Sequence, residues 1–140
     1  MTVRNCLHNG LFRFGVTSLS LADHQMRSLG FEILAKFDEK LNLEVEAESS
    51  SILSSFKNIN QIQLLVTTFK NSIKHENERL PLIITQFVSE ISSVITRPGH
   101  WLFSKANEFL LHKPYFDVED VPMFNFLFYS SSTNSYTRER

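Results

Sequence analysis

The stretch DHQMRSLGFEILAKFDEKL, residues 23–41, decides the fold class. Its apolar side chains recur every three or four residues, which is the spacing of one face of an α-helix. Glu32 precedes Lys36 by four residues, the favourable order for an ion pair on a helix surface. Ser20 with Asp23 three residues later resembles a capping box at the helix start. The stretch predicts an amphipathic helix whose apolar face comprises Met26, Leu29, Ile33, Leu34, Phe37 and Leu41.

Helical spacing also dominates the rest of the chain. Residues 3–19 predict a helix that has Phe14 among its apolar positions and is weakened by Gly10 and Gly15. A short loop would set it antiparallel to residues 23–41. We expect an all-α fold of about six helices. The other predicted helices cover residues 59–73, 81–95, 101–111 and 117–128. Pro81 suits the first turn of the second of these, and residues 96–99 predict where it stops. The apolar positions predicted for the first two are Ile59, Ile62, Leu65, Val66, Phe69 and Ile73, and Ile84, Phe87, Val88, Ile91, Val94 and Ile95.

The predicted domain covers residues 1–129. Within it, residues 42–55 contain three glutamates and five serines, which predicts an internal loop. The serine-rich residues 130–140 predict a mobile polar tail. Thirteen phenylalanines indicate either a thick core or a surface that another molecule covers.

The charge balance weighs against nucleic acid as a direct ligand. Fourteen basic and fifteen acidic residues give a formal charge of -1, and no segment gathers a stripe of lysine and arginine. The single cysteine, Cys6, allows no intrachain disulfide and fits a reducing compartment. No apolar run approaches the ~20 residues of a membrane helix, so no membrane contact is expected.

The motifs that carry catalytic chemistry are missing from the sequence. There is no glycine-rich phosphate loop and no GxSxG, and His75-Glu76 begins like HExxH but has Arg79 in the place of the second histidine. The five histidines show no metal-ligand spacing, and Cys6 and His8 do not share a helix face. The acidic residues at 76–78 and 117–120 are interpreted as residues beside helix ends that cap the helices and face solvent. We predict no catalytic, cofactor-binding or metal-binding residue, no cofactor and no small-molecule substrate.

One pattern resembles a structural repeat. Residues 23–34 place an Asp before an apolar-Arg pair, then Gly30, then an apolar pair, as in the second helix of a HEAT repeat. The alternative is an ordinary amphipathic helix with a chance glycine. The repeat interpretation predicts HEAT/armadillo-like antiparallel pairs that stack in arrays. It also places Gly30 where two helices nearly touch, and we expect Gly30→Ala to be mild or stabilising because alanine favours helix.

Four stretches resemble, in order, the C-terminal domain of the nucleolar pre-ribosomal-associated protein family. The stretch at residues 112–132 is the most specific, because in it DVPMF precedes an aromatic run and serines. The stretches are LSLADHQMRSLGFEIL (19–34), QLLVTTFKNSI (63–73), NERLPLIITQFVSE (77–90) and HKPYFDVEDVPMFNFLFYSSS (112–132).

This resemblance implies a nucleolar role in assembly and rRNA processing of the large ribosomal subunit precursor. Implied partners are other ribosome-assembly proteins, in a complex that includes an RNA helicase, and the rest of the protein's own repeat array. RNA contact would be indirect, and the family supplies no catalytic residue. Family members are much longer, so the chain is expected to be a fragment. The alternatives are a HEAT-like adaptor unrelated to ribosomes and a direct RNA-binding module.

Overall fold

The computed structural model describes residues 2–49, 59–116 and 118, and within these residues it contains six helices and no strand. The prediction of an all-α fold is confirmed. None of these helices is both long enough and apolar enough to cross a membrane. The helices are α1 (Val3–His8), α2 (Leu11–Ser18), α3 (His24–Ser49), α4 (Ile59–Ser72), α5 (Leu82–Ile95) and α6 (Phe103–His112).

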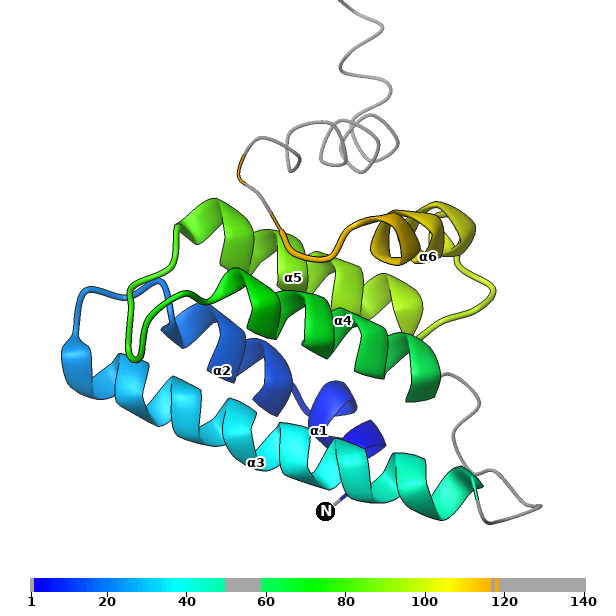
Figure 1. Ribbon diagram of the computed structural model, residues 1–140, viewed down its shortest axis with the longest axis horizontal. Coiled ribbons are helices and arrows are strands. Elements are labelled where there is room, and N and C mark those ends of the chain that lie inside the picture. The colour runs from blue at the N-terminus through cyan, green and yellow to red at the C-terminus, as the bar shows by residue number, and fades with distance from the viewer. Residues whose placement is uncertain (1, 50–58, 117, 119–140) are drawn as a thin grey trace, which may run out of the picture.

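Four helices, α2 to α5, form a ring in which successive helices run in opposite directions (Figure 1). Helix α2 packs on α3 and α5, and α4 packs on the same two helices. Helix α1 contacts α2 and α3, while α6 covers α4 and α5. This is the neighbour order of an up-and-down bundle. Stacked HEAT-like pairs would instead place α2 beside α4, so these contacts do not establish the HEAT-like arrangement.

The core is formed by the buried faces of α4 and α5 together with the helices that pack against them. All six apolar positions predicted for α5 are buried, and five of the six predicted for residues 59–73 are buried as well. The remaining residue, Ile73, is partly buried against the core. The buried positions are Ile59, Ile62, Leu65, Val66 and Phe69 on α4, and Ile84, Phe87, Val88, Ile91, Val94 and Ile95 on α5.

The N-terminal region departs from the prediction of one helix over residues 3–19. Gly10 has a φ of 85°, the left-handed conformation that glycine adopts readily, and it separates α1 from α2. The Asn9 side chain then accepts a hydrogen bond from the Leu11 amide, 3.0 Å away. Because the break shifts the helical phase, Phe12 is buried and Phe14, expected inside, is 44% exposed.

Helix α3 starts close to the predicted position but by different contacts. Asp23 lies just before it and accepts hydrogen bonds from the Gln25 and Met26 amides. The expected capping role of Ser20 is wrong, because its hydroxyl donates to the Thr17 carbonyl. Leu29, predicted on the apolar face, is 43% exposed.

The predicted loop at 42–55 is helical as far as Ser49. Glu44 lies in the stretch predicted as a loop, yet its carboxylate accepts a hydrogen bond from the Val3 amide at 2.8 Å. Val45 packs against the core one residue later. These contacts with other elements extend α3 where local sequence predicts a break. Residues 50–58 lie outside the described part.

Gly30 lies where α2 and α3 nearly touch, as predicted. A Cβ at Gly30 would lie 2.8 Å from both the Gly15 carbonyl oxygen and the Ser18 Cβ. The carbonyl belongs to helix backbone and has little freedom to move. The expectation that Gly30→Ala is mild is therefore wrong, because the contact leaves no room for a methyl group.

The last elements agree with the predictions within the described residues. Pro81 immediately precedes α5 rather than occupying its first turn. Helix α5 ends at Ile95, just before the predicted stop at 96–99. Apart from Val118, the helix predicted over 117–128 and the tail predicted at 130–140 lie outside the described residues.

Candidate functional site

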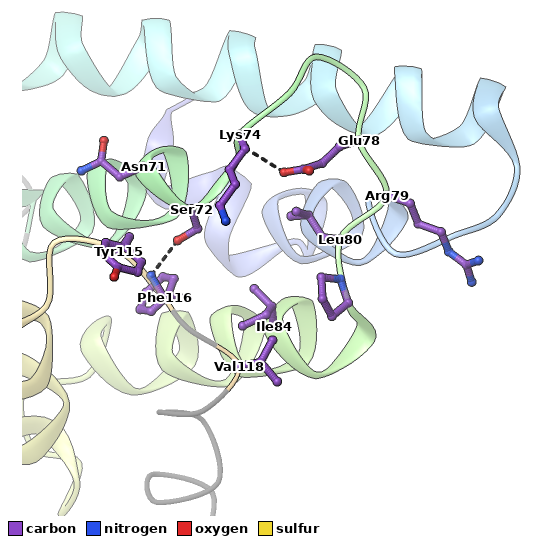
Figure 2. A pocket seen from close by; sticks show the side chains of 11 residues that line it. Asn71, Ser72, Lys74, Glu78, Arg79, Leu80, Ile84, Tyr115, Phe116 and Val118 are labelled. Atoms are coloured by element: carbon purple, nitrogen blue, oxygen red, sulfur yellow. Dashed lines mark hydrogen bonds between the residues drawn. The ribbon is translucent and has the colours of Figure 1, made fainter.

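The segment that follows α6 crosses the end of α4 and the start of α5, and a pocket opens beside it (Figure 2). Two hydrogen bonds between this segment and α4 hold the segment in place. The Asn71 side-chain amide donates to the Pro114 carbonyl at 2.9 Å, and the Phe116 amide donates to the Ser72 hydroxyl oxygen at 2.7 Å. The pairs are more than 40 residues apart in sequence. The pocket therefore depends on the assembled fold.

Three aromatic rings anchor the same segment to the core. The Phe116 ring is buried and meets Phe87 edge-on, with ring centres 5.4 Å apart. It lies nearly parallel to Phe109 at 6.3 Å, and Phe109 in turn meets Phe87 edge-on at 5.5 Å. Such aromatic pairs add about 0.5–1.5 kcal/mol each beyond the area they bury. Phe116 thus fixes the chain at one side of the pocket.

The pocket has a volume of about 330 Å³ and combines apolar walls with a charged rim. Tyr115 and Val118, which are 51% and 44% exposed, line the side formed by the segment after α6. The opposite side is formed by the connection between α4 and α5 and the start of α5. Its described lining residues are Lys74, Glu78, Arg79, Leu80, Pro81 and Ile84.

The α4–α5 connection is held by the turn between α2 and α3. The Leu80 amide donates to the Leu19 carbonyl, and the Arg79 Nε donates to the Ser20 carbonyl, both at 2.9 Å. Arg27 donates from Nε to the Asn77 carbonyl and from Nη1 to the Leu21 and Ala22 carbonyls. Lys74 and Glu78 close the connection on itself through a 2.8 Å bond from the Lys74 amide to Glu78 Oε1. These bonds preorganise the charged rim of the pocket.

The lining of this pocket combines a few ionisable side chains with apolar walls. Among its described lining residues, the ionisable side chains are Lys74, Glu78, Arg79 and Tyr115. Acyl or phosphoryl chemistry needs a nucleophile beside a base or an array of donors aimed at a developing charge. These four side chains do not supply such a set. They do offer hydrogen bonds and charge around an apolar wall, which is how a protein holds a peptide or a side chain of a partner.

The residues weighed as candidates in the sequence are spread over the fold. Cys6 is buried and burial raises the pKa of its thiol, whereas His8 is exposed. His75 and Glu76 line a different, open groove between α3 and the end of α4. In the described part of the chain, no three histidine, cysteine or acidic side chains come together as metal ligands. Asp117, Glu119 and Asp120 lie outside the described residues.

The sequence alone did not reveal this pocket. Its two halves are distant in the chain, and periodicity reports only the faces of single helices. The signal that was present is the run from Lys113 to Phe116, in which a proline and two aromatic residues follow a helix directly.

Comparison with known proteins gives one family. The sequence pattern of Nucleolar pre-ribosomal-associated protein 1 matches residues 12–140. The human protein of that name is 26% identical over 137 residues, which cover 98% of this chain and 6% of the relative. The mouse protein is 26% identical over 136 residues, again with 6% of its length covered. The chain thus spans only a small part of the length of these relatives. No solved structure matches it.

Proposed function

The chain belongs to the family of Nucleolar pre-ribosomal-associated protein 1, and on this basis we propose that it acts as a non-catalytic helical scaffold in ribosome assembly in the nucleolus. Its task is to hold assembly factors through protein–protein contacts. The subunit it serves is the large one, and rRNA processing depends on it indirectly.

The observation that carries this proposal is the length of the family match. Similarity extends from Phe12 to Arg140 rather than over one motif, so it includes α2 to α6 and the segment that forms the pocket wall. The relatives are named for a nucleolar location and for association with pre-ribosomes. Members that share this region are expected to share its helical bundle.

The structure supports binding as the mode of action. The pocket between the α4–α5 connection and Tyr115 is preorganised by hydrogen bonds, and its apolar wall is accessible. Exposed apolar side chains also occur elsewhere, at Trp101 just before α6 and at Leu111 on α6. In a longer protein such residues can contact neighbouring helical units, and HEAT-like stacking would then form between units.

Depletion of the protein tests the proposal. Early precursors of the large subunit should fall while those of the small subunit stay comparatively normal, because a scaffold lost from one pathway slows that pathway alone. The tagged protein should concentrate in the nucleolus and co-purify with assembly factors. Normal large-subunit precursors after depletion would contradict the ribosomal role and favour a HEAT-like adaptor that serves another process.

A further inference from the structure

A second pocket, distinct from that of Figure 2, lies where α1 and α2 meet the C-terminal half of α5. It has a volume of about 280 Å³. Its described lining contains two arginines, one histidine and no acidic side chain. The lining residues are Leu7, His8, Phe12, Arg13, Ser92, Ser93, Thr96 and Arg97.

Two arginines converge on one serine in this pocket. Arg13, from α2, donates from Nη2 to the Ser93 hydroxyl oxygen at 2.8 Å and to the Ser89 carbonyl at 3.3 Å. Arg97, just beyond α5, donates from Nε to the Ser93 carbonyl at 3.1 Å. Each bond uses only one nitrogen of its guanidinium group. The other N–H groups of both side chains remain available to a ligand.

Two carbonyl oxygens of α5 beside this pocket already accept hydrogen bonds from the protein itself. The Ser89 carbonyl accepts the Ser92 hydroxyl at 2.7 Å in addition to Arg13. The Ser93 carbonyl accepts the Thr96 hydroxyl at 3.0 Å in addition to Arg97. Carbonyls at the C-terminal end of a helix repel anions, and these donors offset that repulsion. The pocket therefore presents net positive character.

Two guanidinium groups held next to one residue repel each other, and no carboxylate lines the pocket to offset that repulsion. Guanidinium groups bind phosphate oxygens through paired N–H donors, and such charge-assisted bonds are about twice as strong as neutral ones. We propose that this pocket binds a phosphoryl group carried by a phosphorylated serine or threonine of a partner protein.

The surroundings favour a phosphorylated side chain over the backbone of RNA. RNA binding draws its affinity from several phosphates neutralised along a basic stripe. Here the basic side chains are gathered in one pocket, on a chain with a formal charge of -1. A single phosphoryl group with a charge of about -1.5 to -2 matches the two arginines of the pocket. The inference concerns a different site from the Figure 2 pocket and does not depend on the proposed function.

The test is an NMR titration of the 140-residue chain with N-acetyl-phosphoserine-N-methylamide, at constant ionic strength. The unphosphorylated compound and an oligouridine serve as the other two probes. We expect shifts confined to the Arg13 and Arg97 side chains and the amides of residues 92–97, with the phosphoserine compound only. Arg97→Gln should weaken binding at least tenfold, and Arg4→Gln, on the exposed side of α1, should leave it unchanged.

An Arg13→Gln variant would lose the donors for the ligand and also the hydrogen bonds that link α2 to α5. Arg13→Lys is therefore tested beside it. The lysine keeps the charge but loses the paired donors, and it should weaken binding several-fold while the thermal transition stays near that of the parent. Equal shifts with the unphosphorylated compound, or no localised shift at all, would overturn the proposal. Tighter binding of oligouridine through the same residues would overturn it in favour of RNA.

Discussion

At the scale of single residues, Gly30 has the most direct effect on the packing of α2 against α3. A methyl group there would lie 2.8 Å from the Gly15 carbonyl oxygen, which is part of rigid helix backbone. Overpacking of this kind costs about 1–3 kcal/mol, more than the gain of up to about 1 kcal/mol in helix propensity. Gly30→Ala should therefore lower the free energy of unfolding in a urea titration. Gly99→Ala is the matched control, because nothing lies within 4 Å of its added Cβ. Equal free energies of unfolding for the two variants would show that α2 and α3 can move apart to admit the methyl group at no cost in stability.

Cys6 reports on the packing of α1. Its side chain is buried at 6% exposure, and burial raises the pKa of the thiol because the thiolate loses its hydration. Since the thiolate is the reactive form, alkylation by iodoacetamide at pH 8 should be much slower in the folded chain than in urea. A folded-state rate close to the unfolded rate would mean that α1 detaches readily from α2 and α3.

At the scale of elements, the α4–α5 connection owes its position to the arginines that bind backbone carbonyls. Arg27 bonds to the Leu21, Ala22 and Asn77 carbonyls, so it ties the turn before α3 to the connection. Arg27→Gln should cost about 1–2 kcal/mol locally, since the three bonds are lost. Hydrogen exchange at the Leu80 amide, bonded to the Leu19 carbonyl, should then become about tenfold faster. Lys36→Gln, which removes only an exposed ion pair with Glu32, is the control. Unchanged exchange at Leu80 would show that Arg27 does not hold the connection.

The elements also show what sequence can and cannot predict here. The stripes of α4 and α5 are uninterrupted, so local periodicity placed Ile62, Phe87 and Ile91 in the core correctly. The prediction failed where one glycine reset the phase before Phe12 and where a distant amide, that of Val3, bonded to Glu44. The Figure 2 pocket was missed because its two sides come from distant parts of the chain, and such contacts have no periodic signature in the sequence.

At the scale of the whole molecule, the ring of α2 to α5 buries the core and leaves a preorganised pocket between the α4–α5 connection and the segment after α6. The walls at Tyr115 and Val118 are accessible, and the rim carries Lys74, Glu78 and Arg79. We propose that this bundle contributes to ribosome assembly by holding partner proteins. The pocket and the family match both support this proposal, in which the protein acts by binding partners.

The account is tested most directly by quantitative mass spectrometry of the assembly factors that co-purify with the tagged protein carrying Tyr115→Ser and Val118→Ser. Both side chains are about half exposed, so their replacement should leave folding intact, as circular dichroism can verify. Leu43→Ser, on α3 away from the pocket and 61% exposed, is the matched control. We predict that the pocket variant loses most of a subset of nucleolar assembly factors while the control keeps them. Retention of every factor by the folded pocket variant would contradict the account.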